Sequence, residues 1–320
     1  MARRTLEPSA LFAAACAGDR AALARALSLL ERGDQAAREM GRLAYTRGGT
    51  GYTVGITGAP GAGKSTLTSA VIRHLRTAGT EVAVLAIDPS SPFTGGAILG
   101  DRVRMQDHAT DPGVFIRSMA TRGHLGGLSL ATPEAIRMLD AVGRGWIVVE
   151  TVGVGQVEVE IAGKADTTVV VLNPGWGDSV QANKAGLMEI ADIFVINKAD
   201  RKGVEETRRD IEQMLELSDL AHDAWRPPIL ATVGSTGEGV PALWDAVTGH
   251  RAFIEGSGEL TQRREHRLRE ELREIVARRL EHRAREICTG DRWERLQADV
   301  LERRIDPWSA ADEMLKGVGA

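Results

Sequence analysis

Cysteine and long apolar runs are both scarce in this chain. The two cysteines, Cys16 and Cys288, lie far apart, so the sequence indicates neither a disulfide framework nor a thiolate metal site, and it fits a reducing cytoplasm. No apolar run approaches the roughly 18–20 residues that cross a bilayer. Residues 1–5 include two arginines, but no clean apolar region follows them. We therefore read this start as part of a helix of the mature protein.

An excess of charge of one sign is also missing. The chain has 40 Lys and Arg against 44 Asp and Glu, a net charge of −4. This balance gives no electrostatic reason to expect nucleic acid or an anionic membrane as the main partner. The rest of the composition, 43% hydrophobic and 26% charged over 320 residues, is that of an ordinary globular protein with room for a substantial core.

Three segments differ in pattern. Residues 1–50 are rich in Ala and Leu at helical spacing and predict an N-terminal helical segment. Residues 51–255 alternate short apolar runs with helical patterns. Residues 256–320 are dense in Arg and Glu and predict a C-terminal helical extension, in which a long helix or helix pair carries one apolar stripe: Leu268, Leu272, Ile275, Val276 and Leu280.

The central segment predicts an α/β fold with a mostly parallel sheet. Its apolar, β-branched runs are separated by helical crossovers, which is typical of a parallel sheet covered by helices on both faces. The predicted strands are Thr53–Thr57, Glu81–Asp88, Val114–Met119, Trp146–Thr151, Thr168–Asn173, Ile193–Lys198 and Ile229–Thr232.

A glycine-rich loop follows the first predicted strand and fits the P-loop pattern G-x-x-x-x-G-K-[ST]. Its backbone N–H groups would surround phosphate oxygens at a helix N-terminus. Lys64 would reach the β- and γ-phosphates, and the Ser65 hydroxyl would bind Mg²⁺, with Thr66 beside it. The full set is Gly58, Ala59, Pro60, Gly61, Ala62, Gly63, Lys64, Ser65 and Thr66.

Three acids are candidates for holding Mg²⁺ or orienting water. Glu150 ends a predicted strand and is followed three residues later by Gly153, the form of the GTPase D-x-x-G motif with Glu for Asp. Asp88 ends another strand, directly before a proline, which would place its carboxylate at the ligand-binding edge of the sheet. Asp101 follows in the loop beyond. Either aspartate could ligate Mg²⁺ directly or through water.

A base-selection motif follows the sixth predicted strand. Asn197, Lys198 and Asp200 form the N-K-x-D pattern. The Asp200 carboxylate can accept hydrogen bonds from N1 and N2 of guanine, which adenine cannot offer, and such a site discriminates strongly. After the last strand, backbone N–H groups are placed to meet the guanine carbonyl, and we predict that they come from Val233, Gly234 and Ser235.

These motifs together resemble the MeaB/ArgK group, the G-protein chaperones of adenosylcobalamin-dependent acyl-CoA mutases. The resemblance covers nearly the whole chain and is most specific at 87–92, 100–105, 122–127, 150–156 and 173–178. It implies Lys64 and Ser65 at the phosphates, and Asp88, Asp101 and Glu150 around Mg²⁺ and the attacking water. The stretch 173–184 resembles a mobile loop that the family uses as an extra switch, with three side chains for partner coupling: Asp178, Gln181 and Lys184.

The resemblance also implies the partner and the assembly. In the family, GTP binding and slow hydrolysis gate the loading of adenosylcobalamin onto the mutase and the ejection of damaged cofactor. Pairing through the C-terminal extension implies a homodimer. This chain lacks a D-x-H-x-x-G motif, so we expect the mutase, and not this chain, to carry the cobalamin.

Three other readings stay open. A nickel-delivering metallochaperone GTPase would need clustered Cys or His ligands, whereas His108 and His124 are isolated and expected to face solvent. A transport kinase would need ATP, against which Asp200 argues. A non-catalytic, nucleotide-dependent scaffold would bind GTP without hydrolysing it.

Overall fold

The computed structural model describes residues 7–88, 106–120, 131–151, 164–175, 190–217 and 223–316. The chain divides into two compact units, Met1–Arg263 and Arg264–Ala320. Among the described residues, no helix is both long and apolar enough to cross a membrane. The predicted boundaries at residues 50 and 255 stay predictions.

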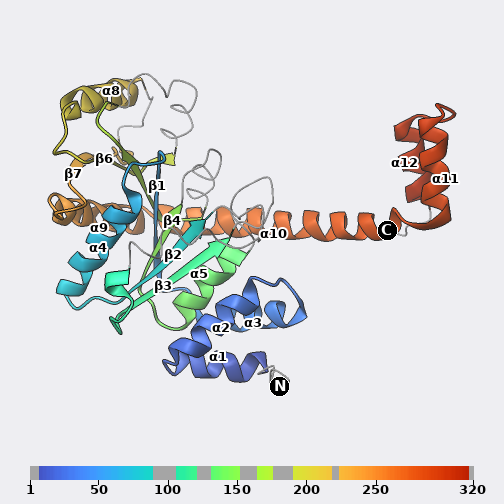
Figure 1. Cartoon of the computed structure of the whole chain (residues 1–320), viewed down its shortest axis with the longest axis horizontal. Coiled ribbons are helices and arrows are strands. Elements are labelled where there is room, and N and C mark those ends of the chain that lie inside the picture. The colour runs from blue at the N-terminus through green and yellow to red at the C-terminus, as the bar shows by residue number, and fades with distance from the viewer. Residues whose placement is uncertain are drawn as a thin grey trace. The chain divides into compact units, whose positions relative to one another are not determined.

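A parallel sheet forms the centre of the first unit (Figure 1). Among the described residues it has seven strands in the order β3-β2-β4-β1-β5-β6-β7, and each neighbouring pair is parallel. The strands are β1 (Tyr52–Gly58), β2 (Val82–Asp88), β3 (Val114–Ala120), β4 (Trp146–Thr151), β5 (Thr167–Leu172), β6 (Ile193–Asn197) and β7 (Ile229–Thr232).

The predicted fold class is therefore confirmed, and the strand ends differ by a residue in places. The sequence predicts a strand through Lys198, but β6 ends at Asn197. The reason is that Lys198 has φ 60°, in the left-handed region, where the chain leaves the extended conformation.

Helices cover both faces because successive strand residues point to opposite sides. Among the described residues, the helices of this unit are α1 (Pro8–Cys16), α2 (Arg20–Leu30), α3 (Gln35–Arg47), α4 (Lys64–Thr77), α5 (Ala131–Ala141), α8 (Val204–Glu216) and α9 (Val240–Gly256). In β2, Ala83, Leu85 and Ile87 pack on one face with the N-terminal helices and α5, whereas Val82 and Val84 pack on the other face with α4 and α9. A smaller cluster joins α8 to β5 and β6.

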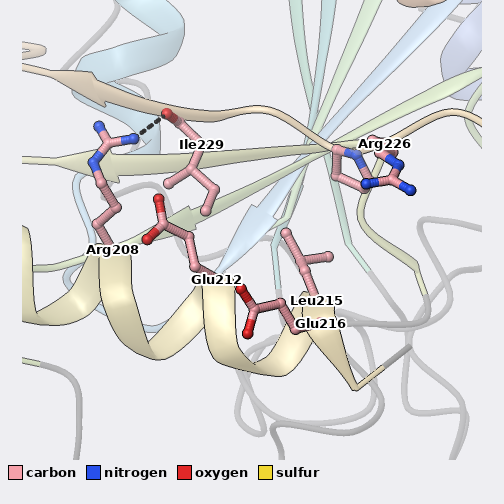
Figure 2. A pocket seen from close by; sticks show the side chains of 7 residues that line it. Arg208, Glu212, Leu215, Glu216, Arg226 and Ile229 are labelled. Atoms are coloured by element: carbon pink, nitrogen blue, oxygen red, sulfur yellow. Dashed lines mark hydrogen bonds between the residues drawn. The ribbon is translucent and has the colours of Figure 1, made fainter. Parts of the chain in front are cut away.

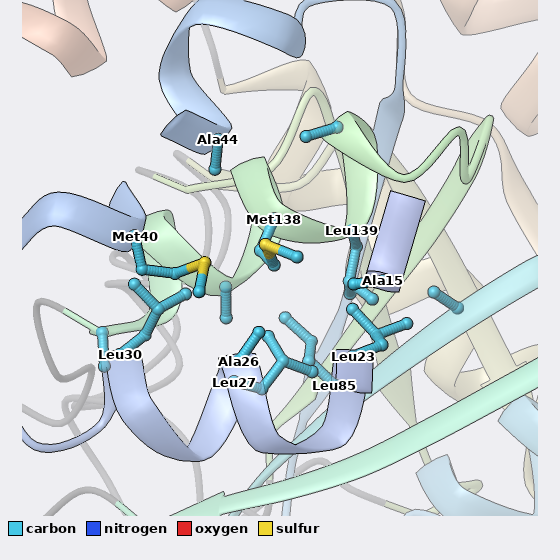
Figure 3. Close-up of a cluster of buried hydrophobic side chains, with 14 of the residues drawn as sticks. Ala15, Leu23, Ala26, Leu27, Leu30, Met40, Ala44, Leu85, Met138 and Leu139 are labelled. Atoms are coloured by element: carbon cyan, nitrogen blue, oxygen red, sulfur yellow. The ribbon is translucent and has the colours of Figure 1, made fainter. Parts of the chain in front are cut away.

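The N-terminal helices belong to the core of this unit. Figure 3 shows Leu23 and Leu27 of α2, Met40 of α3 and Met138 of α5 in one cluster with Leu85 of the sheet, all buried. The linker 48–51 is then fixed by Asp140 at the end of α5, whose carboxylate accepts hydrogen bonds from the N–H groups of Gly49, Thr50 and Gly51. The chain therefore enters β1 from a defined point.

The second unit consists of most of α10 (Glu259–Ile287) with α11 (Gly290–Leu301) and α12 (Pro307–Leu315). Leu296 of α11 packs on Ala310 and Met314 of α12 in a small core of its own. The predicted apolar stripe lies on α10 with its side chains 37–63% exposed. Its members do not pack into this small core.

Candidate nucleotide-binding site

The P-loop connects the middle of the sheet to helix α4. Gly58 ends β1 with φ 131°, and a β-carbon there would collide with the backbone of Val171 on β5. Gly63 precedes α4 with φ 88°. Both conformations require glycine, so these two residues let the backbone turn tightly between strand and helix. The helix begins at Lys64 and directs its N-terminal N–H groups into this turn.

The Lys64 ammonium lies inside the loop. This side chain is 6% exposed, and its Nζ donates hydrogen bonds to the carbonyl oxygens of Gly58 at 2.6 Å and Ala59 at 3.0 Å. An anionic ligand would add an opposite charge close to this ammonium, and a buried charge is costly unless it is paired. This placement fits a phosphate-binding role.

A hydroxyl and a carboxylate meet beside the loop. The Ser65 hydroxyl donates a hydrogen bond to Glu150 Oε1 at 2.5 Å, and Glu150 is completely buried at the end of β4. Both groups offer the hard oxygen ligands that Mg²⁺ prefers. Ile56 of β1 pairs with Glu150 of β4. Ser65 lies in the first turn of α4, which follows β1 through the P-loop, so the pairing of β1 with β4 places Glu150 near this turn. The donor set fits a magnesium ion.

The remaining predicted acids are only partly placed. Residue Ala86 of β2 pairs with Glu150, so the backbone of Asp88 lies two residues further along the same edge of the sheet. Asp101, Gly153 and His124 lie outside the described residues. So do the three proposed switch residues, Asp178, Gln181 and Lys184.

Asn197 joins the base motif to the P-loop. Its side-chain Nδ2 donates to the carbonyl oxygen of Ala62 at 2.8 Å, and its Oδ1 accepts from the Thr232 hydroxyl at 3.1 Å and from the Gly234 N–H at 3.0 Å. Lys198 adds a second tie, from its Nζ to the Gly61 carbonyl at 2.6 Å. The phosphate loop and the loop after β7 are thus held at fixed positions by one asparagine.

The other predicted base-site residues surround this point. Asp200 is exposed in the turn that follows β6. Val233 is buried, its N–H donating to the carbonyl of Glu238, and Ser235 is exposed. The phosphate end and the base end therefore lie at the carboxyl ends of β1, β4, β6 and β7, the edge at which open α/β sheets bind ligands.

Comparisons with known proteins agree with this geometry. Residues 23–289 match the family model described as methylmalonyl Co-A mutase-associated GTPase MeaB. The chain belongs to the MeaB family. The GTPase ArgK of Escherichia coli is 39% identical over 80% of each chain, and a Pyrococcus abyssi protein with GTPase in its name is 52% identical over 94% of each chain.

Two further comparisons extend over nearly the whole MeaB-family chain. The mouse protein named methylmalonic aciduria type A homolog, mitochondrial, is 32% identical over 96% of this chain and 78% of its own length. The crystal structure of a LAO/AO transport system kinase covers 99% of both chains with a TM-score of 0.73 and 26% identity. The resemblance identified from the motifs is therefore confirmed at the family level.

Sequence reasoning missed one residue of this site and misjudged another. Thr232 was not predicted, although it orients Asn197; its position directly before the predicted backbone donors was the available clue. His108 is expected to face solvent but is 7% exposed, with Nε2 2.9 Å from the Ser69 hydroxyl of α4. That prediction is wrong, because the short 3₁₀ turn η1 (Gln106–His108) directs the ring onto the helix.

A separate hollow of about 500 Å³ lies between α8 and the segment that leads into β7 (Figure 2). Arg208 of α8 donates to the carbonyl oxygen of Ile229 at 2.8 Å, along the outer edge of β7. Two arginines and two glutamates line the hollow, so its charge favours neither an anion nor a cation. Its lining residues are Arg208, Glu212, Leu215, Glu216, Arg226, Pro227 and Ile229.

Proposed function

We propose that this MeaB-family protein is a Mg²⁺-dependent GTPase that acts as a chaperone for an adenosylcobalamin-dependent acyl-CoA mutase. In this role it gates the loading of the cofactor and the release of damaged cofactor. The observation that carries the proposal is the position of Asn197, which joins the phosphate loop to the base loop within a chain of this family. The mutase part rests on the names of the family and of the mouse relative.

Each part of the site has a proposed role in hydrolysis. Lys64 would neutralise the β- and γ-phosphates, and the backbone N–H groups of the P-loop, which Pro60 lacks, would surround them. Ser65 and Glu150 would hold Mg²⁺, together with Asp88 and Asp101, either directly or through water. Bound there, the ion would neutralise charge that develops on the phosphate oxygens. Gly153 would let the backbone approach the γ-phosphate.

Guanine selection is proposed for the other end of the site. Asp200 would accept hydrogen bonds from N1 and N2 of guanine, while Asn197 and Lys198 hold the loops in place. Of the three predicted backbone donors, we propose that the Ser235 N–H meets the guanine carbonyl, because the N–H groups of Val233 and Gly234 donate to the Glu238 carbonyl and to Asn197 Oδ1. Adenine has no N–H donors at these positions and would leave the Asp200 carboxylate without hydrogen-bond partners. We therefore expect GDP to bind and ADP to be rejected.

Turnover of GTP with and without a mutase tests the proposal. We expect hydrolysis by the chain alone near the roughly 10⁻⁴–10⁻² s⁻¹ of unassisted G proteins. The reason is that the glutamine nearest the turn at Gly153 is Gln156, three residues further on, and not the residue directly after Gly153, where it could orient the attacking water. We expect purified methylmalonyl-CoA mutase to raise this rate, and a tagged chain to retain the mutase from its native cell.

Three outcomes would contradict the proposal in different ways. Tight GTP binding without single-turnover hydrolysis would favour the scaffold. Equal affinity for ADP and GDP would remove the guanine assignment. Retention of a nickel enzyme in place of a mutase would favour the metallochaperone reading.

A further inference from the structure

Three polar groups lie on one stripe of helix α4, the helix that begins at the P-loop. Ser69 is four residues beyond Ser65, and Arg76 is eleven beyond it. At 3.6 residues per turn, four residues are about one turn and eleven about three turns. The three side chains therefore face the same side of the helix, with Ser65 at the nucleotide end.

The segment 106–113, which we call the clamp segment, holds this stripe at two points. At the first, His108 Nε2 lies 2.9 Å from the Ser69 hydroxyl and 3.1 Å from the Ser69 carbonyl oxygen. At the second, Arg76 Nε donates to Asp111 Oδ2 at 2.9 Å. The two points are seven residues apart on α4, about 10 Å along the axis, so the segment follows the helix for two turns.

The first contact defines the proton on the His108 ring. A carbonyl oxygen can only accept a hydrogen bond, so the contact with Ser69 O requires a proton on Nε2. Both His108 and Ser69 are 7% exposed. Water therefore has little access to replace this donor if the imidazole is removed, and the loss would be felt by the helix.

The clamp segment is itself held from its outer side. Arg20 of α2 donates to the carbonyl oxygens of Asp111 and Pro112 at 3.0 Å each and to that of Val114 at 2.7 Å. Within the segment, Asp111 Oδ1 accepts from the Gly113 N–H at 2.7 Å. The segment is thus a rigid support with one side on the N-terminal helices and the other on α4.

We propose that His108 is a positioning residue for the Mg²⁺ end of the nucleotide site. It acts through Ser69, one turn from Ser65, and fixes α4 so that the Ser65 hydroxyl meets the Glu150 carboxylate on β4. The inference rests on the proposed nucleotide site and adds a residue to it. A shift of about 1 Å in α4 would separate the Ser65–Glu150 pair, and misplacement of that size is costly in a preorganised site.

The test compares two amide replacements of His108. In His108→Gln the amide nitrogen can occupy the position of Nε2, whereas in His108→Asn it falls short, near Nδ1. We expect the Mg²⁺ concentration that half-saturates binding of mant-GMPPNP, a fluorescent non-hydrolysable GTP analogue, to rise about 5- to 10-fold in His108→Asn and His108→Ala. It stays within about twofold of wild type in His108→Gln. His74→Ala, on the same helix, serves as the matched control and stays near wild type.

The readout separates this inference from the proposed function and from mere stability. Because mant-GMPPNP is not hydrolysed and no mutase is present, failure of the hydrolytic or chaperone role leaves the measurement intact. The melting temperature is measured for each variant. If His108→Asn melts lower but shows the Mg²⁺ dependence of wild type, His108 is only a structural residue and the inference is overturned. Equal Mg²⁺ dependence in His108→Asn and His108→Gln overturns it as well.

Discussion

Asn197 is the residue at which the two ends of the nucleotide site meet. Its amide fills both hydrogen-bonding roles, as donor toward the P-loop and as acceptor from Thr232 and Gly234. It is 2% exposed, so any unmatched replacement would leave buried polar groups without partners. The motif N-K-x-D revealed this residue in the sequence. The role of its partner Thr232 could not be predicted from a motif, because a hydroxyl at the end of a strand can bond to many different groups.

Base selection is tested at Asp200. In Asp200→Asn, an amide donor would face the donors of guanine, so we expect GTP affinity to fall by at least ~2 kcal/mol, with xanthosine triphosphate partly accepted. Competition against a fluorescent guanine nucleotide measures both effects. Asp223→Asn, an exposed change away from the site, is the control. Unchanged GTP affinity in Asp200→Asn would remove the assignment.

The Mg²⁺ role of Glu150 is tested by Glu150→Gln, which keeps the shape of the side chain and an acceptor for the Ser65 hydroxyl but removes the charge. We expect hydrolysis to fall about 10- to 100-fold, with a higher Mg²⁺ requirement, on the scale of lost support at a metal site. A Mg²⁺ titration of single-turnover hydrolysis measures this. If the variant matches wild type at every Mg²⁺ concentration, Glu150 does not serve the ion.

At the scale of elements, the strands were predictable and some of their connections were not. Residues 82–87 of β2 are apolar without interruption because both faces of the strand are covered, and this pattern shows in the sequence. The order of the strands depends on long-range pairing and was not predicted. The contacts that fix the start of α10 were not predicted either. The residues that make them come from distant parts of the sequence and follow no periodicity.

That fixation centres on Asp192, which directly precedes β6. Its carboxylate accepts hydrogen bonds from the Thr168 N–H at 2.7 Å and from the Arg263 guanidinium of α10 at 3.0 Å. His250 Nε2 of α9 lies 3.2 Å away, and its Nδ1 lies 2.8 Å from the Thr167 hydroxyl. Thr167 and His250 are completely buried, so this Asp–His–Thr arrangement cannot meet a substrate and is structural.

The pH dependence of stability follows from this group. Burial alone would raise the pKa of Asp192, but His250 and Arg263 outweigh it and hold the pKa below its ordinary value. A depressed carboxyl pKa stabilises the fold above the unfolded value of about 3.9 and loses that contribution as pH falls through the folded value. We expect the wild-type free energy of unfolding to decline steeply below about pH 4.

Asp192→Asn removes this ionisation. We expect the variant to be less stable by roughly 3 kcal/mol at pH 7, because Arg263 loses its buried partner. It should show a shallower decline between pH 5 and pH 3. Urea unfolding at several pH values gives the comparison, with exposed Asp245→Asn of α9 as control. If the free energy of unfolding falls equally steeply with decreasing pH in wild type and Asp192→Asn, another carboxyl group determines the loss of stability in acid.

At the scale of the whole molecule, the apolar stripe of α10 needs an explanation. Leu272 and Leu280 are each 63% exposed, and the stripe continues through Leu268, Ile275 and Val276. Contiguous exposed apolar surface on a helix commonly marks an interface. The resemblance implied a homodimer through this extension, and we propose a two-fold contact in which the stripe of one copy meets that of another.

The structure shows where the proposed dimer can be tested without damage to the first unit. Removing everything after Gly258 would also remove Arg263 and leave Asp192 without its guanidinium partner, so loss of the dimer could reflect misfolding. A point change in the stripe avoids this. In Leu272→Glu, a charge would be buried in the proposed contact, and we expect the dimer to weaken by at least ~30-fold, the ~2 kcal/mol scale of an interface anchor.

Ala277→Glu adds the same charge to the same helix at an exposed position about 140° around from Leu272, and we expect it to remain dimeric. Light scattering over a dilution series, with a melting temperature for each variant, measures the result. If both variants dissociate alike, general charge on α10 is responsible and the stripe is not the contact. If neither dissociates while wild type is a dimer, the interface lies elsewhere on the chain. If the stripe takes no part in dimerisation, it is free to bind the mutase. Retention of the mutase by wild type but not by Leu272→Glu would then identify the stripe as the mutase-binding surface.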